Sequence, residues 1–575
     1  MMDQRTGQTL DSVAERYLDL LASRGIDYIF GNAGTDFPPL IEALAQARHT
    51  GRPTPRAVVV PHENVAVAMA HGYYMVTGRM QAVMVHVGLG TANAINGLFN
   101  ATRLNIPMLL AAGRTPITEG GVFGGRNNYI NWAQEMFDQA GMVRELVKWE
   151  YELRDPVQLQ TVVDRALAIA QSEPRGPVYL TLPREVLAAP AGQSELAPSA
   201  TQLPAVASEP DPAAIEQLSA WLAEAKRPLI VTASAGNDPA LWPALAEFAE
   251  TYAIPVVQYR PRYMALPTDH PMHCGYNPIP LLRDADLVLT LDCDVPWIPD
   301  ELGRDLQAKV VHAGFDPLFT RYPVRGFRSD LAIVGSTTAL MQRLSSALRA
   351  KPGSTSGVKA RSEEVARLRR KLAPASAFAA GEVPKEMTSR WVTACIERAK
   401  DDTTVLLNEY PLVLEELTIQ RPGEYFCHSP AGGLGWAMGA ALGVKLAKPE
   451  ATAIAVIGDG CYMFGNPTPM HMVSRALGLP VLIVICNNGR WGAVHRATLS
   501  MYPQGHAAAE DEPPFSCLEP SPDFEHIVRA SEGHSERVED PCELPAAIER
   551  ALKAVREGRQ AVLNVICEAV YARTS

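Results

Sequence analysis

Residues 455–491, AVIGDGCYMFGNPTPMHMVSRALGLPVLIVICNNGRW, decide the fold that we expect for this chain. The apolar run at residues 453–457 predicts a buried strand, which ends in a Gly-Asp-Gly turn around Asp459. A second apolar run, at residues 481–486, predicts another strand and delivers an Asn-Asn pair to the same edge of the sheet. Ligands of parallel α/β sheets bind outside the carboxyl ends of the strands, so both polar clusters lie where a ligand is expected.

These two clusters have the chemistry of a metal site. A carboxylate and a carboxamide beside backbone carbonyls supply the oxygen ligands that Mg²⁺ prefers, and Mg²⁺ commonly links proteins to phosphate groups. Asp459 and the Asn487-Asn488 pair therefore predict a site for a metal ion and a diphosphate. Each cluster alone is also an ordinary turn sequence. Only their joint occurrence, one after each of two predicted strands, favours the metal site.

The composition is that of a globular protein with several domains. The chain has 575 residues, of which 47% are hydrophobic and 20% are charged. Its net charge of −11 argues against nucleic acid or an anionic membrane as a partner. The nine cysteines begin at Cys274 and form no C-x-x-C motif, which argues against disulfides and zinc sites. No stretch is typical of a signal peptide or a membrane span, so we expect a cytoplasmic protein.

The N-terminal third alternates predicted strands with predicted helices. Helices are expected at residues 10–23 and 65–73. The expected strands are residues 26–30, 57–60, 81–85, 108–112 and 175–183. This β-α alternation predicts a parallel sheet covered by helices on both faces.

Glu63 comes directly before a predicted helix of small apolar residues. Burial of a carboxyl group at that place would favour its neutral form, and groups perturbed in this way are concentrated at functional sites. Acids at helix starts are also common as caps. Glu63 is therefore a candidate catalytic residue, with capping as the alternative.

His86 and Thr35 are polar residues at places where predicted strands end. His86 ends a predicted strand, and Thr35 lies in the turn Gly-Asn-Ala-Gly-Thr at residues 31–35. Either side chain could position a carboxylate or carry a proton, and imidazole suits proton transfer near neutral pH. In isolation, a strand-end histidine is more commonly a local hydrogen-bonding residue. Thr35 or Asp36 could instead cap the next helix.

A glycine-rich segment lies in the C-terminal third. Gly432 and Gly433 precede Leu434 and a predicted helix, and glycines permit a close approach of the backbone to a ligand. A helix that starts there would direct its positive end at a phosphate group. In isolation, Leu434 would be an ordinary core residue.

Together these motifs resemble the thiamine diphosphate (ThDP) enzymes, and more narrowly the acetolactate synthase and benzoylformate decarboxylase group. The resemblance covers nearly the whole chain and implies three doubly wound α/β domains with parallel sheets. The first would bind the pyrimidine of the cofactor, the second would be a central domain, and the third would bind the diphosphate. The implied limits are residues 1–186, 213–350 and 387–575, with linkers at 187–212 and 351–386. Both linkers also stand out in composition, the first by Ala, Pro and Ser and the second by mixed charge.

The resemblance implies a role for each cofactor-side residue. Glu63 would hydrogen-bond N1′ of the aminopyrimidine and so promote loss of the proton at C2 of the thiazolium. Leu434 would be the apolar wedge that bends the cofactor. The metal ligands would be Asp459, the side chain of Asn488 and the backbone carbonyl of Arg490. The other cofactor contacts would be Asn408, Glu409, Gly432, Gly433, Gly458, Gly460, Cys461 and Trp491.

The resemblance also indicates the substrate side. His86 and Thr35 take the places of active-site residues in the benzoylformate decarboxylases. Gln134 lies in a segment, residues 132–135, that resembles the Phe-Gln-Glu of acetolactate synthases, although a solvated helix face is an alternative. The adjacent histidine pair of the pyruvate decarboxylases is absent between Gly113 and Trp149.

We therefore expect an acetolactate synthase-like carboligase that acts on a 2-oxo acid. A benzoylformate-type decarboxylase is the second reading and a 2-hydroxyacyl-CoA lyase the third. An inactive scaffold or regulatory paralogue is the last. In this family the two cofactor-binding domains meet across subunits, so the resemblance implies a homodimer or homotetramer with active sites at the subunit interface.

The central third predicts a small α/β unit without a nucleotide fingerprint. Its expected strands are residues 228–232, 255–257, 287–291 and 309–312. The first turn, residues 233–236, lacks the G-x-G-x-x-G pattern of dinucleotide sites. Acetolactate synthases carry FAD in this domain, but here we expect no FAD and a structural spacer.

Overall fold

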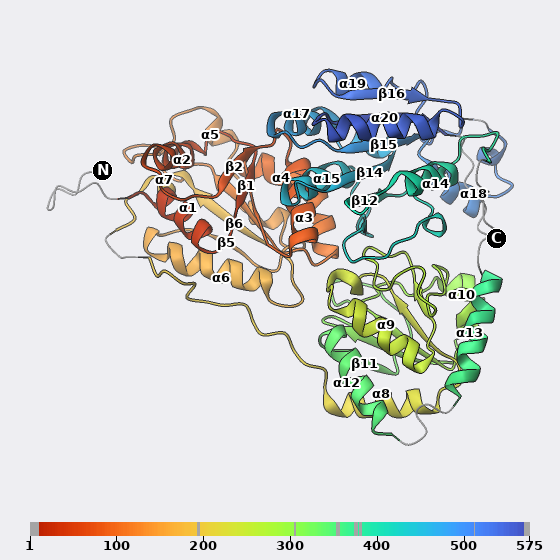
Figure 1. Ribbon diagram of the computed structural model, residues 1–575. Coiled ribbons are helices and arrows are strands. Elements are labelled where there is room, and N and C mark those ends of the chain that lie inside the picture. The colour runs from red at the N-terminus through yellow and green to blue at the C-terminus, as the bar shows by residue number, and fades with distance from the viewer. Residues whose placement is uncertain are drawn as a thin grey trace. The chain divides into compact units, whose positions relative to one another are not determined.

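The structure is a computed structural model, and it describes residues 11–192, 196–303, 306–351, 357–372, 378, 382–510 and 512–567. The chain groups into two compact units, which are drawn with their helices and strands in Figure 1. The first unit contains the residues up to Ala205, His428–Arg537 and the residues from Arg550. The second contains Val206–Cys427 and Val538–Glu549.

The first unit contains a parallel sheet from the N-terminal third of the chain. Its strand order is β2-β1-β3-β4-β6-β5, and every neighbouring pair is parallel. The strands are β1 (Tyr28–Gly31), β2 (Arg56–Val59), β3 (Ala82–Val85), β4 (Met108–Arg114), β5 (Glu150–Glu152) and β6 (Pro177–Pro183).

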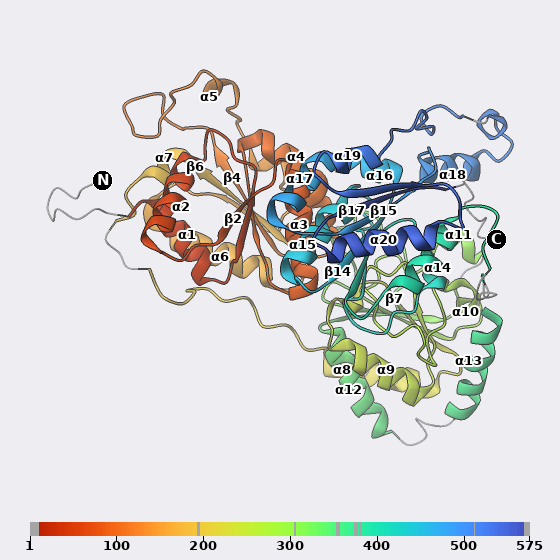
Figure 2. The same ribbon diagram turned by 45° about the horizontal axis from the view of Figure 1, so that its top comes forward.

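Helices cover this sheet because successive strand residues point to opposite faces. Alternate residues, such as Ala82 and Met84 of β3, belong to a hydrophobic core with α1 (Val13–Ser23), α2 (Pro38–Thr50) and α6 (Leu159–Gln171). From the other side the sheet is covered by α3 (Glu63–Thr77) and α4 (Val87–Arg103). The short helix α5 (Ile130–Ala133) lies on a segment that extends away from the sheet, as Figure 2 shows.

Helix α3 packs closely on α15 (Trp436–Ala447) in the same unit, and both figures draw them side by side. The closeness depends on glycine. A Cβ atom at Gly72 would lie 2.1 Å from the backbone oxygen of Ala440, and one at Gly443 would lie 2.1 Å from the backbone oxygen of Met69. The backbones of the two helices are therefore in direct contact.

The C-terminal third adds three parallel strands to the first unit: β14 (Thr452–Gly458), β15 (Leu482–Asn487) and β17 (Ala561–Ile566). Two helices, α16 (Asp459–Phe464) and α17 (Pro467–Leu477), connect β14 to β15. Later elements are α18 (Gly492–Met501), α19 (Glu525–Arg529), β16 (His534–Val538) and α20 (Leu544–Arg556).

The second unit contains the central sheet, whose strands are all parallel in the order β11-β10-β9-β7-β8. Its strands are β7 (Pro228–Thr232), β8 (Val256–Gln258), β9 (Leu287–Leu291), β10 (Lys309–Gly314) and β11 (Leu331–Val334). Its helices are α8 (Pro212–Glu224), α9 (Leu241–Tyr252), α12 (Thr337–Arg349) and α13 (Val358–Leu372). The same unit contains α14 (Ser389–Ala399) and the parallel pair β12 (Thr404–Glu409) and β13 (Tyr425–Cys427).

The predicted fold class, three α/β sheets with parallel strands, is confirmed. All the predicted strands are present within a few residues, whereas β5, β11, β13 and β16 were not predicted as separate strands. The predicted domain and linker limits stay a prediction. Among the residues that the structure describes, no helix is long and apolar enough to cross a membrane.

Candidate active site

Glu63 is the first residue of α3 and is buried, with 3% of its surface exposed. Its two carboxylate oxygens accept hydrogen bonds from different amides. Asn32 Nδ2 donates to Oε1 at 2.9 Å, and Asn93 Nδ2 donates to Oε2 at 3.1 Å. Both oxygens of this buried carboxyl group therefore have a hydrogen-bond donor. The two amides also fix the orientation of Glu63 at the carboxyl ends of the strands.

His86 lies between two side chains that sequence reasoning did not connect with it. Its Nδ1 is 2.5 Å from Oδ1 of the buried Asp36, and its Nε2 is 3.1 Å from Nε2 of Gln134. The hydrogen bond to Asp36 raises the pKa of His86, while burial opposes that rise. The structure thus brings together the predicted residues His86 and Gln134.

Thr35 does not share the enclosed position of its neighbour Asp36. It is exposed, and its backbone carbonyl accepts a hydrogen bond from Nη1 of the buried Arg184 at 3.1 Å. The backbone of the turn is therefore anchored while the Thr35 side chain lies at the surface. Its predicted role towards the substrate stays a prediction.

A row of asparagines holds the backbone of the glycine-rich segment. Asn100 Nδ2 donates to the carbonyl of Gly433 at 2.7 Å, and Gly433 N–H donates back to Asn100 Oδ1 at 3.1 Å. The carbonyl of Leu434 accepts from Asn96 at 3.1 Å and from Asn64 at 3.4 Å. Leu434 itself is half-buried, so its side chain is only partly enclosed by the unit.

Asp459 fits the predicted metal site. It begins α16 with 3% of its surface exposed, and its Oδ2 is buried without a hydrogen-bond partner. Burial raises its pKa to about 6, although backbone N–H groups, including those of Gly460 and Gly489, act in the opposite direction. A cation would supply the partner that this carboxylate oxygen lacks.

The other predicted metal ligands lie in the turn after β15. Asn488 Oδ1 accepts from Arg490 N–H at 3.0 Å, and the carbonyl of Arg490 accepts from Gly492 N–H at 2.9 Å. Carbonyl oxygens of this kind are acceptors, as metal ligands must be. Among the described residues no group of three or more His, Cys, Asp or Glu side chains could hold a metal. The predicted site is of another kind, because it has a single carboxylate.

The remaining predicted contacts in the first unit lie at the start of α16, beside Trp491 and in the glycine-rich segment. A Cβ atom at Gly460 would lie 2.3 Å from the ring of Trp491, so glycine lets the indole pack against the start of α16. Gly458 is the N-cap of α16, and Cys461 is buried within it. Gly432 has φ +69°, a conformation that favours glycine.

Asn408 and Glu409 end β12 in the second unit, and both are buried. Asn408 Nδ2 donates to the hydroxyl of Tyr425 at 3.0 Å, and its Oδ1 accepts from Leu412 N–H at 3.1 Å. The side chain of Asn408 thus helps to hold the turn after β12. Contacts of Asn408 and Glu409 with a cofactor stay a prediction.

Sequence reasoning did not identify Asp36, Asn32 and the asparagines of α4 as site residues. A signal for the asparagines was present, because residues 93, 96 and 100 are spaced by three and four and therefore share one face of a helix. No comparable signal marked Asp36, which reads as a turn residue until β1 and β3 are placed side by side.

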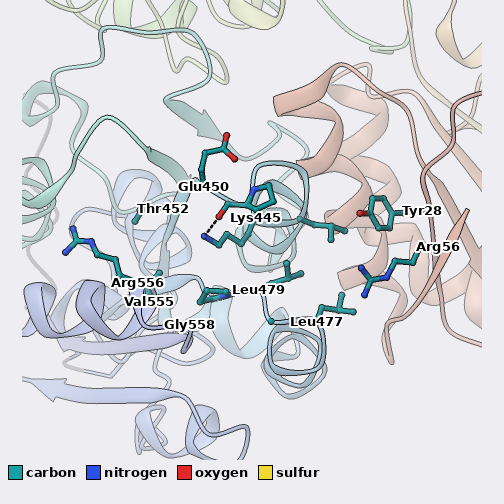
Figure 3. Close-up of a pocket in the computed structure, with 14 residues that line it drawn as sticks. Tyr28, Arg56, Lys445, Glu450, Thr452, Leu477, Leu479, Val555, Arg556 and Gly558 are labelled. Carbon is teal, nitrogen blue, oxygen red and sulfur yellow. Dashed lines mark hydrogen bonds between the residues drawn. The ribbon is translucent and has the colours of Figure 1, made fainter.

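A cavity of about 600 Å³ lies at the opposite ends of the strands in the first unit (Figure 3). Its lining includes Tyr28, Arg56 and Thr452, which are the first residues of β1, β2 and β14. Lys445 also lines it, and its ammonium group donates to the carbonyls of Pro449 at 2.7 Å and Ala451 at 2.9 Å. This cavity is therefore separate from the polar groups at the carboxyl ends of the strands.

Comparison with known families gives matches along most of the chain. Models of thiamine pyrophosphate enzymes match in three places: the N-terminal TPP binding domain at residues 11–142, the central domain at residues 215–344 and the C-terminal TPP binding domain at residues 410–565.

Individual relatives are similar at low identity. Benzoylformate decarboxylase of Pseudomonas aeruginosa strain PAO1 is 26% identical over 499 residues, which cover 83% of this chain and 86% of the relative. The acetolactate synthase large subunit of Parasynechococcus marenigrum is 24% identical over 547 residues, which cover 92% and 83%. The crystal structure of benzoylformate decarboxylase from Polynucleobacter necessarius matches with a TM-score of 0.79 at 20% identity, over 98% of this chain and 99% of that one. This last likeness shows the shared fold.

Proposed function

The chain belongs to the thiamine pyrophosphate enzymes, and on that premise we propose that it breaks or forms a carbon–carbon bond next to the carbonyl group of a 2-oxo acid. It is a ThDP-dependent enzyme of the class that includes decarboxylases and carboligases. When bound, the cofactor supplies an electron sink for the carbon that loses its carboxylate. The protein supplies binding, orientation and proton transfer.

Glu63 carries this proposal. It is a buried carboxylate whose oxygens are both fixed by amide donors, Asn32 and Asn93, at the carboxyl end of the first sheet. An acid held in this way can hydrogen-bond one ring nitrogen of a bound heterocycle and stabilise its protonated form. Gly90 keeps the space open, since a Cβ atom there would lie 3.1 Å from Glu63 Oε1.

Asp459, Asn488 and the backbone carbonyl of Arg490 would hold a divalent cation, Mg²⁺, and through it the diphosphate. The support is the buried Oδ2 of Asp459, which has no hydrogen-bond partner, together with the oxygen ligands that Mg²⁺ prefers. The glycines before Leu434 would let a ligand approach the backbone, and Leu434 would contact the cofactor's rings.

The first candidate reaction is acetolactate synthase-like carboligation, in which a second carbonyl compound reacts after CO₂ is lost. Gln134 supports it, because its amide lies 3.1 Å from Nε2 of His86 and would hydrogen-bond the second carbonyl if His86 contacts the substrate. The second candidate is benzoylformate-type decarboxylation. The contact of His86 with Asp36 favours decarboxylation, because a protonated His86 could donate the proton that the product requires.

We also propose that the chain acts as a homodimer or homotetramer. The segment around α5 exposes large apolar side chains that are typical of surfaces which bury against another protein: Phe123, Tyr129, Trp132 and Phe137. Sedimentation equilibrium should then give a mass of at least two chains. A cytoplasmic location and the absence of nucleic acid partners stay predictions.

The first experiment tests Glu63. In the Glu63→Gln protein with ThDP and Mg²⁺, exchange of the cofactor's C2 proton should fall by at least about 100-fold, the scale of one acid–base contribution, while calorimetry still detects cofactor binding. Glu42→Gln is the matched control, because Glu42 is exposed on α2. Unchanged exchange in Glu63→Gln would refute its role.

The second experiment concerns the substrate. Pyruvate, benzoylformate, glyoxylate and a mixture of formyl-CoA with a ketone are each supplied, and CO₂ and coupled products are followed separately. Carboligation predicts coupled product in step with CO₂, whereas decarboxylation predicts free aldehyde. Product from formyl-CoA without CO₂ would indicate the lyase instead.

A further inference from the structure

We propose that Asp36 is a positioning residue that keeps a proton on Nδ1 of His86, so that Nε2 of His86 is the nitrogen directed at the substrate. The inference rests on the proposed function, because His86 acts on a substrate only if the site binds one. Asp36 lies between β1 and α2, and sequence reasoning suggested for it no more than a helix cap.

The contacts of Asp36 determine which ring nitrogen carries the proton. Oδ1 is 2.5 Å from His86 Nδ1, and Oδ2 accepts from Val87 N–H at 3.4 Å. Val87 begins α4, and the N-terminal end of a helix stabilises a carboxylate. An ionised carboxylate can only accept hydrogen bonds, so Nδ1 of His86 must be the donor.

Two glycines provide the space for this contact. A Cβ atom at Gly113 would lie 1.6 Å from Asp36 Oδ2, and one at Gly34 would lie 2.0 Å from His86 Nδ1. No side chain at either position is compatible with the observed geometry. The contact is thus enclosed by the backbone on both sides, and Asp36 itself is only 2% exposed.

The other ring nitrogen, Nε2, contacts Gln134, whose amide can either donate or accept a hydrogen bond. Gln134 Nε2 lies 3.1 Å from His86 Nε2 and donates to it when the imidazole is neutral. A carboxamide has both a donor and an acceptor, so rotation of the Gln134 amide would also accept from a protonated imidazole. Nε2 can therefore gain and lose a proton while Asp36 holds the ring in place.

The charged groups that face His86 are Asp36 and Glu63, and both favour the protonated imidazole. The hydrogen bond to Asp36 has the largest effect, and burial of His86 acts against it. Loss of the Asp36 charge should therefore lower the pKa of His86.

The test is Asp36→Asn in the full-length protein. The new carboxamide can keep the contact with Val87 N–H through its oxygen, and then it presents its N–H to His86 Nδ1. We expect the tautomer of His86 to reverse, with the proton on Nε2. Selective ¹³Cδ2-histidine labelling reads the tautomer and the pKa in the cofactor-free protein, and the His86 signal is the one missing from His86→Gln.

Two further variants separate this effect from a loss of folding. Gly34→Ala would displace the imidazole from Asp36 while both titrating side chains remain, so it should lower the His86 pKa as Asp36→Asn does. Asp138→Asn is the matched control, because Asp138 forms an exposed pair with Arg144 and should leave His86 unchanged.

Kinetics then link the geometry to the reaction. The limb of the kcat/KM profile that disappears in His86→Gln should move to lower pH in Asp36→Asn, with the cofactor's C2 proton exchange unchanged. An unaltered tautomer and pKa would overturn the proposal. A shifted His86 pKa with an unchanged kcat/KM profile would overturn the proposal as well. If exchange of the cofactor's C2 proton stays normal in that case, the proposed ThDP function is not affected.

Discussion

At the residue scale, three buried carboxylates of the first unit, Glu63, Asp36 and Asp459, differ in the hydrogen bonds that their oxygens accept. Glu63 has two amide donors and Asp36 has an imidazole and a backbone N–H, whereas Oδ2 of Asp459 has no partner. Uncompensated burial of a charged oxygen is unfavourable unless a ligand supplies the missing interaction. Asp459 is therefore the carboxylate whose state should depend most on an added cation.

This difference predicts opposite effects for Asp459→Asn. Without metal at pH 7, the variant should be more stable than the natural protein by about 1–3 kcal/mol, because it removes a buried charge of which one oxygen has no hydrogen-bond partner. Stabilisation by Mg²⁺ with ThDP should be lost, with at least a tenfold rise in the apparent Kd for the metal, the scale of a disrupted metal site. Differential scanning calorimetry with and without Mg²⁺ measures both effects.

Asp523→Asn is the control for that change, because Asp523 is largely exposed in the same unit. It should alter neither the stability nor the response to Mg²⁺. An Asp459→Asn protein that Mg²⁺ still stabilises as strongly as before would contradict the assignment of Asp459 as a metal ligand.

Single residues also mark how far the sequence could predict the site. Glu63 and Asp459 are recognisable because each stands out against apolar neighbours at the end of a strand. Asn32, Asn93 and Asp36 are ordinary polar residues of turns and helices. Their importance arises only when β1 and β3 pair and α4 lies across the sheet, and those are contacts between distant parts of the chain that no local pattern encodes.

At the element scale, the contact of α3 with α15 gives a clear mutational test. Alanine at Gly72 would place Cβ 2.1 Å from the backbone oxygen of Ala440 and 2.6 Å from its Cα, so neither contact can be relieved by turning a side chain. We expect Gly72→Ala to lower the free energy of unfolding by about 1–3 kcal/mol. That loss would be net of a gain of up to about 1 kcal/mol in helix propensity.

The matched control is Gly120→Ala. Gly120 has open space where a Cβ atom would lie, so alanine should change the free energy of unfolding by less than about 0.5 kcal/mol. Urea denaturation followed by circular dichroism gives both values. Equal effects of the two substitutions would contradict close packing of α3 on α15.

The strands and helices themselves were largely predictable. Apolar runs located β3, β4, β7, β9, β14 and β15, because buried parallel strands are apolar on both faces. The strands that were missed, β5, β11, β13 and β16, have exposed or half-buried residues in most positions or only three residues. Their pairing depends on the neighbouring strand rather than on their own composition.

At the scale of the whole molecule, four buried histidines predict a loss of stability in acid. Burial lowers the pKa of His71 to about 3 and those of His273, His312 and His471 to about 4. In the unfolded chain each would titrate near its ordinary value of about 6.5. Between these values the unfolded state binds more protons, so stability is fully present above about pH 6.5 and falls as the pH decreases towards 4.

Each histidine contributes a slope of up to about 1.4 kcal/mol per pH unit, so the four together contribute about 5 kcal/mol per unit near pH 5. Urea denaturation at several pH values measures this slope. His71→Leu should reduce it by about one quarter. His526→Asn should leave it unchanged, because His526 is exposed. A stability that does not vary between pH 5 and 7 would contradict the prediction.

The contact between α3 and α15 has a further consequence, because each helix starts at a functional group. Glu63 opens α3, and the turn with Leu434 comes directly before α15. Two helices whose backbones are in contact cannot slide along each other, so Glu63 and the turn at Leu434 are held at a fixed distance. A bulky substitution in the middle of either helix, several turns from its start, should therefore shift Glu63 relative to the turn at Leu434 and lower the activity, although no functional group is changed.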